Sequence, residues 1–295
     1  MLWILNPDAE LELERPLNYQ TNHATLAAMR RMAPRFRLLT GSDDMTLLPD
    51  LQEADPAPRR ALLWCPTPGA RRIAVGLGYK LPASPDPSVL ARVNDKALLA
   101  QSPLPAPACR ELLEGDGAVE RAENLLAGFG PLRLKRRFSF AGRRQRKIRA
   151  PLKEDDLRFL RDGIRLGGLI VESELEISAE FSIHGMILPG GSPLLGHPAR
   201  VEADRYGSVM TIERIPETHP RTSELTGLGL RAAELLGSLG YFGPFGLDVL
   251  ETSSRLVASD LNARFTLGFR VGLGDRLALA LSLLFEYAPA APDQS

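Results

Sequence analysis

The most chemically suggestive residues of this chain lie near its C-terminus. Asp248 lies in an apolar segment, and Asp260, Asn262 and Arg264 follow a second apolar segment beyond a short turn at 253–254. Residues two apart on a strand point to the same side, so Asp260 and Asn262 are expected to face the same way. Pairing of the two strands would bring Asp248 to that face. Two carboxylates and an amide oxygen suit Mg²⁺, so the spacing predicts a magnesium site.

Two lysines and two glutamates precede this block on separate elements. Lys96 lies in a helical segment, and Lys135 lies on a strand that leads into a small-residue loop ending at Gly142. Such lysines can neutralise the phosphates of a nucleoside triphosphate, and the N–H groups of a small-residue loop can approach the same oxygens. Glu172 ends a later strand, and Glu180 follows eight residues on. With a metal screening the phosphate charge, the set favours phosphoryl transfer.

The elements that must hold these residues follow an α+β pattern. The first ninety residues indicate a small βαβ unit that ends at a proline-rich connection and contains no chemical motif. We predict a two-lobed α+β fold behind this small α/β unit, divided into domains 1–89, 90–190 and 191–295. The expected strands are 2–5, 36–39, 61–65, 169–171, 176–188, 200–212, 245–250 and 256–261, with a basic hairpin at 132–148. The expected helices are 23–32, 88–101, 116–127, 153–166, 222–239 and 275–287.

The same residues carry a family resemblance. They comprise Lys96, Lys135 with its loop, Ile170-Val171-Glu172, and the blocks 243–248 (GPFGLD) and 260–264 (DLNAR). In this order they resemble the ATP-grasp superfamily of carboxylate–amine ligases over residues 90–287. The resemblance implies that ATP lies between two α+β lobes. It also implies that a carboxylate becomes an acyl phosphate, which an amine attacks, so that the enzyme is an ATP-dependent ligase forming a C–N bond.

The resemblance further implies which residues bind the nucleotide. Lys96 and Lys135 would bind phosphates, with Gly142 in the loop that covers them. The backbone from Glu172 to Leu175 would read the adenine edge. Glu180 would accept hydrogen bonds from the ribose hydroxyls.

For catalysis, the resemblance implies a metal set and two cations. Asp248, Asp260 and Asn262 would hold Mg²⁺, for which Mn²⁺ could substitute, although the family usually has Glu at the position of Asp260. Arg264 would contact the γ-phosphate or the acyl phosphate, so Arg264 and Lys135 are the implied catalytic residues. The substrates would be a small carboxylate (an amino acid or a peptide) and an amine, and the protein could form a homodimer.

The overall composition is that of a cytoplasmic globular protein. The 295 residues include 36 Lys plus Arg and 36 Asp plus Glu, a formal net charge of 0, which argues against nucleic acid as a partner. No apolar run approaches the ~20 residues needed to cross a bilayer, so we expect no membrane association. Cys65 and Cys109 are too few for a disulfide framework. The four histidines lack metal-ligand spacing, and we expect them to be structural.

One local feature leaves a second function open. Residues 133–149 contain nine Lys or Arg and no acid. We interpret the segment as a lid over phosphates, but basic residues beside Phe138 and Phe140 could also bind RNA or another polyanion. The alternative is a non-catalytic nucleotide- or polyanion-binding module that keeps the ATP-grasp fold. Further candidate anchors for a substrate carboxylate are Arg205, Arg221 and Arg270.

Overall fold

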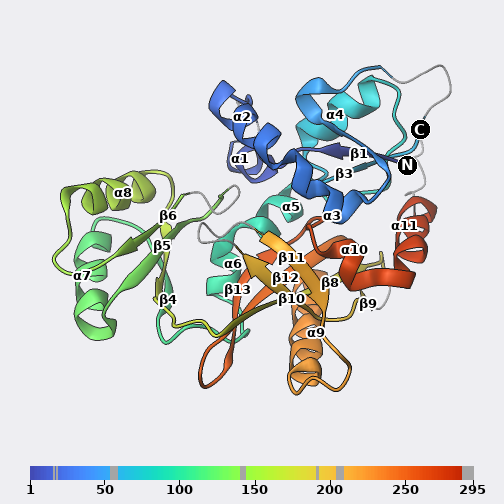
Figure 1. The fold of residues 1–295 in the computed structure, drawn as a ribbon. Coiled ribbons are helices and arrows are strands. Elements are labelled where there is room, and N and C mark those ends of the chain that lie inside the picture. Colours follow the sequence, from blue (N-terminus) through green and yellow to red (C-terminus); the bar gives the residue numbers. More distant parts are fainter. Residues whose placement is uncertain are drawn as a thin grey trace.

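The strands that the structure describes form three β-sheets, each with helices packed beside it (Figure 1). The structure is a computed structural model that describes residues 1–15, 17, 19–53, 59–139, 144–190, 193–203 and 209–287. It confirms the predicted mixed α+β fold. Within these ranges, no helix combines the length and the hydropathy that a membrane crossing requires.

The N-terminal sheet is parallel, with the strand order β2-β1-β3. β1 is the predicted strand at Leu2–Leu5, and Trp3 and Ile4 within it are fully buried, as expected for a parallel strand covered on both faces. α2 (His23–Met32) begins where predicted because the Asn22 side chain accepts a hydrogen bond from the Thr25 N–H at 2.9 Å. The remaining elements of this unit are α1 (Ala9–Glu14), β2 (Asp44–Leu47), η2 (Leu48–Asp50), β3 (Ala61–Leu63) and α4 (Pro68–Gly76).

The predicted strand at 36–39 is wrong. The chain is helical there, with the 3₁₀ turn η1 (Ala33–Phe36) running into α3 (Arg37–Thr40). Phe36 and Leu39 are both buried, and a spacing of three places them on one side of a helical turn. A short apolar run does not distinguish a strand from a buried helical segment, which explains the error.

A four-stranded antiparallel sheet in the order β4-β7-β5-β6 contains the predicted basic hairpin. Leu134 and Val171 point to the face that packs beneath α7 and α8, and both are fully buried in this second core. The cross-strand pair Arg133 and Glu172 lies on the opposite, polar face, together with Lys135. The elements are β4 (Arg110–Leu113), α7 (Ala118–Phe129), β5 (Leu132–Arg136), β6 (Gln145–Ile148), α8 (Glu154–Arg165) and β7 (Leu169–Ser173).

The largest sheet has the order β11-β10-β8-β12-β13, with β9 paired to β8. Phe181 and Phe245 are buried on the face against which α9 packs. The predicted strand 176–188 is shorter than expected, because β8 begins at Ala179 and Ile177 is 45% exposed. The elements are β8 (Ala179–Ile187), β9 (Leu194–Leu195), β10 (Ala199–Ala203), β11 (Val209–Arg214), α9 (Thr222–Ser238), β12 (Gly243–Glu251), β13 (Leu256–Asn262), α10 (Phe269–Leu273), η3 (Gly274–Arg276) and α11 (Leu277–Glu286).

The predicted helix at 88–101 is two helices instead of one. α5 (Pro87–Asn94) ends at Asp95, whose backbone is extended with φ −76° and ψ 122°, and α6 (Lys96–Ala100) begins directly after it. The Asp95 carboxylate accepts a hydrogen bond from the Ala97 N–H at 2.9 Å and caps α6. The break places Lys96 at the first residue of a helix that packs beside β13.

One hydrophobic core is shared by the N-terminal unit and the largest sheet. Trp3 packs edge-on against Phe265 with ring centroids 4.9 Å apart, and Phe36 contacts Trp64 in the same way at 4.9 Å. The four-stranded sheet β4-β7-β5-β6 (the central sheet) has its own core. The domain limits 1–89, 90–190 and 191–295 stay a prediction.

Candidate active site

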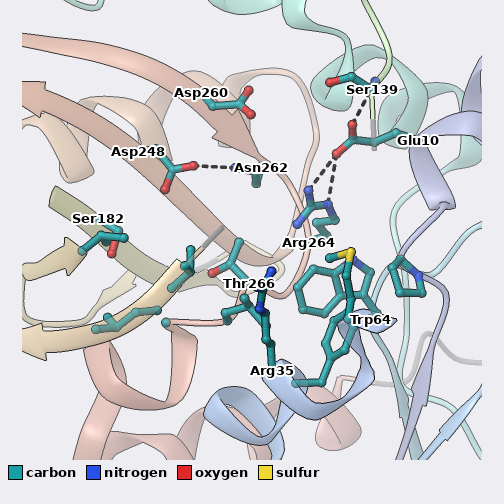
Figure 2. A pocket seen from close by; sticks show the side chains of 18 of the residues that line it. Glu10, Arg35, Trp64, Ser139, Ser182, Asp248, Asp260, Asn262, Arg264 and Thr266 are labelled. Atoms are coloured by element: carbon teal, nitrogen blue, oxygen red, sulfur yellow. Dashed lines mark hydrogen bonds and ion pairs between the residues drawn. The ribbon is translucent and has the colours of Figure 1, made fainter. Parts of the chain in front are cut away.

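Three polar side chains meet on one face of β12 and β13. The register pairs Asp248 with Asp260 and Gly246 with Asn262, and residues directly opposite each other point to the same face. The Asn262 amide donates a hydrogen bond to Oδ2 of Asp248 at 3.2 Å. Figure 2 shows the three side chains side by side on these strands. The structure therefore brings together the three residues of the predicted metal set.

The polar face extends onto the neighbouring strand β8. Ser182 pairs with Asp248 in the register, and Glu180 and His184 lie two residues to either side of Ser182, so all three point to this face. Glu180 is half-buried, and burial raises its pKa. Beyond β8 the face becomes apolar, since Val201 of β10 pairs with Glu180.

Lys96 forms an ion pair with the metal set. Its Nζ lies 2.6 and 2.8 Å from the two carboxylate oxygens of Asp260. Burial lowers the pKa of Lys96, but the negative charges of Asp260 and Glu10 outweigh burial and raise it. Burial likewise raises the pKa of Asp260, and the charges of Lys96 and Lys135 outweigh that effect and lower it. Both partners are therefore charged at neutral pH.

Asp248 differs from Asp260 in its protonation. Burial, followed by the negative charge of Asp260, raises the pKa of Asp248 to about 7. A carboxylate with this pKa is partly protonated at neutral pH, and a metal ion must displace that proton to bind. In the described part of the chain, no group of three or more His, Cys, Asp or Glu side chains has metal-binding geometry; the predicted set contains two carboxylates and one amide.

Lys135 is bound to Glu172 across the central sheet. Its Nζ lies 2.7 Å from Oε2 of Glu172 and donates a hydrogen bond to the Ser259 carbonyl of β13 at 3.1 Å. Arg110 takes the other Glu172 oxygen at 2.6 Å and also donates to the Ala258 carbonyl at 2.6 Å. These contacts hold the polar face of the central sheet against β13.

Of the remaining predicted nucleotide residues, Leu175 lies half-buried in the connection between β7 and β8. Gly142 lies outside the described residues. The structure thus brings Lys96 and Lys135 to β13, where their charges act on Asp260. It places Leu175 on the connection between the four-stranded sheet and the largest sheet.

Arg264 is held by an acid that the sequence analysis did not identify. Its guanidinium donates to Oε1 of Glu10 on α1, from Nη2 at 2.7 Å and from Nε at 3.2 Å, and lies 5.0 Å from the centre of the Trp64 ring. The other Glu10 oxygen accepts a hydrogen bond from the Ser139 N–H at 3.2 Å. Glu10 therefore links the N-terminal unit to both other sheets (Figure 2). No local signal marks Glu10, because alternating Glu and apolar residues in a short helix suggest a solvated face.

A cavity of about 500 Å³ lies between this face and the N-terminal unit. One side is polar and includes the three residues of the metal set with Arg264. The other side comes from α2, η1 and Trp64. Its lining residues are Pro7, Glu10, Ala28, Arg31, Met32, Arg35, Phe36, Trp64, Ser139, Gln145, Ser182, His184, Val201, Val209, Ile212, Asp248, Asp260, Asn262, Arg264, Thr266, Leu267 and Gly268.

His184 lies buried at the base of this cavity. Its Nε2 is 2.9 Å from the Ser182 hydroxyl and its Nδ1 is 2.8 Å from the Thr266 hydroxyl. Burial lowers the pKa of His184 to about 3. A Cβ on Gly268 would lie 2.3 Å from Nε2 of His184, so this glycine is required for the ring to fit. His184 is a neutral, packed side chain that supports the cavity.

The basic stretch 133–149 is largely neutralised by acids from other elements. Arg133 and Lys147 pair with Glu174 at 2.7 and 3.2 Å. The Arg136 guanidinium lies 4.7 Å from the centre of the Phe159 ring. The other described ion pairs of this stretch join Lys135 to Glu172, Arg137 to Asp95, Arg144 to Glu14 and Arg146 to Asp156. Phe140 lies outside the described residues, and the described side chains give the polyanion alternative no support.

Of the three arginines considered as carboxylate anchors, the two that the structure describes do not line this cavity. Arg221 forms ion pairs with Glu224 and Glu251 at 2.9 and 2.7 Å. Arg270 donates to the backbone carbonyls of Leu39 and Thr40, both at 2.8 Å, and so ties α10 to α3. Arg205 lies outside the described residues.

Sequence comparisons give no match: neither a protein-family model nor a curated protein matches the chain. Solved structures do resemble it. Biotin carboxylase from Campylobacter jejuni has a TM-score of 0.62 at 14% identity, covering 98% of this chain and 72% of that one. D-alanyl-alanine synthetase A from Vibrio cholerae has a TM-score of 0.57 at 12% identity, covering 97% of each chain. N5-carboxyaminoimidazole ribonucleotide synthetase from Thermus thermophilus has a TM-score of 0.54 at 18% identity, covering 90% of this chain and 72% of that one.

These similarities extend over nearly the whole chain and over three different kinds of ATP-grasp enzyme. The protein therefore has the ATP-grasp fold, and the predicted superfamily is confirmed at the level of the fold. At these identities the comparisons define the architecture, and the chemistry has to be argued from the residues that line the cavity.

Proposed function

We propose that the protein is an ATP-dependent carboxylate–amine ligase that works with Mg·ATP. The observation that carries the proposal is the shared face of β12 and β13, where Asp248, Asp260 and Asn262 meet beside one cavity. Lys96 and Arg264 flank the same face. The fold supports the choice of nucleotide, since the biotin carboxylase domain of Hydrogenobacter thermophilus 2-oxoglutarate carboxylase has this fold and was solved with MgADP and bicarbonate.

The donor set fits a magnesium-bound nucleotide. Asp248 and Asp260 would supply carboxylate oxygens and Asn262 an amide oxygen, which are hard ligands that Mg²⁺ or Mn²⁺ accepts. When bound, the metal would screen the negative charge of the β- and γ-phosphates. The ion pair of Lys96 with Asp260 already provides one positive charge at this position.

The nucleotide would lie where the central sheet meets β13. Lys96 and Lys135 would exchange part of their contacts with Asp260 and Glu172 for phosphate oxygens. Gly142 would belong to the loop over those phosphates. The backbone from Glu172 to Leu175 would face the adenine edge. Glu180, whose side chain makes no hydrogen bond or ion pair within the described residues, would accept from the ribose hydroxyls.

The proposed reaction has two steps. An oxygen of the acid substrate attacks the γ-phosphorus and ADP leaves, which gives an acyl phosphate. The amine nitrogen then attacks the acyl carbon, inorganic phosphate leaves, and the nitrogen loses a proton. Arg264 and Lys135 would stabilise the charge on the transferring phosphoryl group, so the chain needs no side-chain nucleophile. We infer that the acid is an amino acid or a short peptide.

Acid-dependent ADP release tests the proposal. The protein is incubated with Mg·ATP, a panel of amino acids and dipeptides, and hydroxylamine, which converts an acyl phosphate into a detectable hydroxamate. Release of ADP together with hydroxamate, for at least one acid, is the expected result. If Mg·ATP binds but no acid gives ADP release, the non-catalytic nucleotide-binding alternative replaces the ligase. The predicted homodimer is checked separately by light scattering.

A further inference from the structure

Two acids of α1 have different surroundings. Glu12 is turned toward α4, where its carboxylate accepts a hydrogen bond from the Thr67 hydroxyl at 2.6 Å and another from the Gly69 N–H at 2.7 Å. Glu10 instead lines the cavity, although its side chain is only 6% exposed. The contacts of Glu12 fix α1 to the rest of the N-terminal unit, so the Glu10 carboxylate is held at the cavity from an anchored helix.

The Glu10 carboxylate joins two donors that follow different sheets. Oε1 accepts from Nη2 and Nε of Arg264 at 2.7 and 3.2 Å, and Oε2 accepts from the Ser139 N–H at 3.2 Å. Arg264 comes shortly after β13 and Ser139 shortly after β5. Figure 2 shows the carboxylate between the two residues, with Asn262 of the metal set beside Arg264. One anion therefore connects the largest sheet to the central sheet at the edge of the metal set.

Both donors are groups that the proposed function assigns to phosphates. Arg264 would stabilise the charge of the transferring phosphoryl group, and Ser139 is the first residue of the small-residue loop that ends at Gly142. Guanidinium groups and backbone N–H groups are donors that proteins commonly use for phosphate oxygens. A carboxylate presents the same kind of acceptor, two oxygens that share a negative charge. Glu10 therefore satisfies these donors as phosphoryl oxygens would.

The donors of Arg264 are already in use. Its Nη1 donates to the Phe265 carbonyl at 3.2 Å, and its other edge, Nε with Nη2, is held by Glu10. That edge is a fork suited to two oxygens of one anion. A phosphoryl group that took this fork while Glu10 kept it would also place like charges side by side, which is strongly unfavourable. The two anions therefore exclude each other from Arg264.

The charge of Glu10 also acts on a second cation of the site. Burial lowers the pKa of Lys96, and the negative charges of Asp260 and Glu10 outweigh burial and raise it. Glu10 thus neutralises Arg264 by direct contact and contributes to the field at Lys96, which is a predicted phosphate ligand.

We propose that the Glu10 carboxylate holds the position of the transferring phosphoryl group and competes with it for Arg264 and for the Ser139 N–H. This inference rests on the proposed function. Glu10 is a positioning residue, because it keeps the guanidinium and the loop N–H directed at one point. The phosphoryl group displaces the Glu10 carboxylate, which turns into the cavity that it lines. Arg264 can stabilise the charge of the phosphoryl group only after this exchange.

Nucleotide affinity tests the competition without turnover. Mg·ADP and Mg·AMPPNP, a non-hydrolysable ATP analogue that carries the γ-phosphoryl group, are titrated by calorimetry into the wild type and Glu10→Gln. We expect Glu10→Gln to bind Mg·AMPPNP about 10-fold more tightly than the wild type, because the competing charge is removed. Its affinity for Mg·ADP should stay within about 3-fold. A residue with a purely structural role would leave the ratio of the two affinities unchanged.

Two further variants serve as the control and the safeguard. Asp50→Asn removes the same charge from the N-terminal unit, but Asp50 pairs with Arg30 at 2.9 Å, is 46% exposed and does not line the cavity. It should change both affinities less than about 2-fold. Glu10→Asp keeps the charge but ends one methylene short of the two donors, and it replaces Glu10→Gln if circular dichroism shows that variant to be unfolded at the assay temperature. It should bind Mg·AMPPNP about 3-fold more tightly than the wild type.

Three results would overturn the inference. They are Mg·AMPPNP binding that is absent, unchanged or weaker in the Glu10 variant, an equal gain for Mg·ADP, and an equal gain in Asp50→Asn. A failure of the proposed function is distinguishable from these. If the Glu10 variant gains affinity for Mg·AMPPNP alone but no acid yields a hydroxamate, the ligase proposal fails and the phosphoryl position stands. If hydroxamate forms while the affinity ratio is unchanged in that variant, the ligase stands and the competition is refuted.

Discussion

Two sides of one cavity contribute to the candidate site in different ways. On the sheet side, the metal set and Arg264 lie within a short stretch of chain, and strand register alone places them together. On the helical side, Glu10 contacts Arg264 across a separation of 254 residues. Local geometry therefore fixes the sheet side, whereas tertiary packing fixes the helical side. We expect substitutions on the sheet side to abolish chemistry, and those on the helical side to change stability and substrate affinity.

The largest effect is expected from the metal set. Asp248→Ala and Asn262→Ala should each lower acid-dependent ADP release at least ~1,000-fold, because they remove a ligand of a metal that stabilises the transition state. Melting temperatures should change little, since the two side chains share only one hydrogen bond, at 3.2 Å. Asp275→Asn, at an exposed residue of η3, is the control. Retention of a tenth of the activity by either variant would remove the metal assignment.

The helical side is tested by Glu10→Gln. Its side chain is 6% exposed and that of Arg264 is 16% exposed, so the substitution leaves a buried guanidinium without its counter-charge. We expect the free energy of unfolding to fall by about 2 to 3 kcal/mol, measured by urea denaturation.

The control for this change lies on the same helix. Glu14 pairs at 2.8 Å with Arg144, whose side chain is 36% exposed, and Glu14→Gln should cost less than ~1 kcal/mol because water screens the pair. If the two variants were equally stable, the ion pair between Glu10 and Arg264 would not be the contact that joins the two sides.

The base of the cavity has a pH signature. The folded pKa of His184 is about 3, against about 6.5 for an unfolded histidine. Above pH 6.5 the side chain is neutral in both states. As the pH falls below 6.5, the unfolded state binds a proton that the folded state does not, so stability is lost. Between pH 7.5 and 5, the free energy of unfolding of the wild type should fall by ~2 kcal/mol more than that of His184→Gln.

Urea denaturation at the two pH values measures this difference. His23→Gln is the control, because His23 is exposed at the start of α2. It should follow the wild type at both pH values. If His184→Gln instead loses stability in parallel with the wild type, His184 takes up a proton in the folded state. Burial would then not keep the imidazole neutral.

The contrast between the sheet side and the helical side also explains how much of the site the sequence could predict. Asp248, Asp260 and Asn262 were predictable because alternation along a strand and a short turn define a face without knowledge of other elements. The helical side was missed because the apolar run at 36–39 was assigned to a strand, and with a helix over 23–36 the spacing of Ala28, Met32 and Phe36 would have been visible. Glu10 had no such signal, because its partner comes from the far end of the chain.

The basic hairpin shows a different limit of a local sequence pattern. Residues 133–149 predicted a surface available to phosphates or polyanions, since the stretch itself contains no acid. The neutralising acids come from α1, the start of α6, α8 and the connection after β7. A local charge run therefore indicates a free basic surface only when no other element supplies its counter-charges, and one chain segment does not reveal that.

The smallest effect concerns Asp95, which directly precedes Lys96 and caps the helix that begins there. Its carboxylate caps α6 and pairs with Arg137. Asp95→Ala should lower the free energy of unfolding by ~1 kcal/mol through the lost cap and raise the KM for ATP a few-fold, because Lys96 is the first residue of the helix that loses its cap. Asp86→Ala is the matched control, since Asp86 caps α5 by accepting from the Ser88 N–H at 2.7 Å but does not adjoin Lys96. A similar loss of stability in both variants, with a raised KM only for Asp95→Ala, would assign the break between α5 and α6 to the positioning of Lys96. A raised KM in both would show that the helix pair as a whole sets the affinity for ATP.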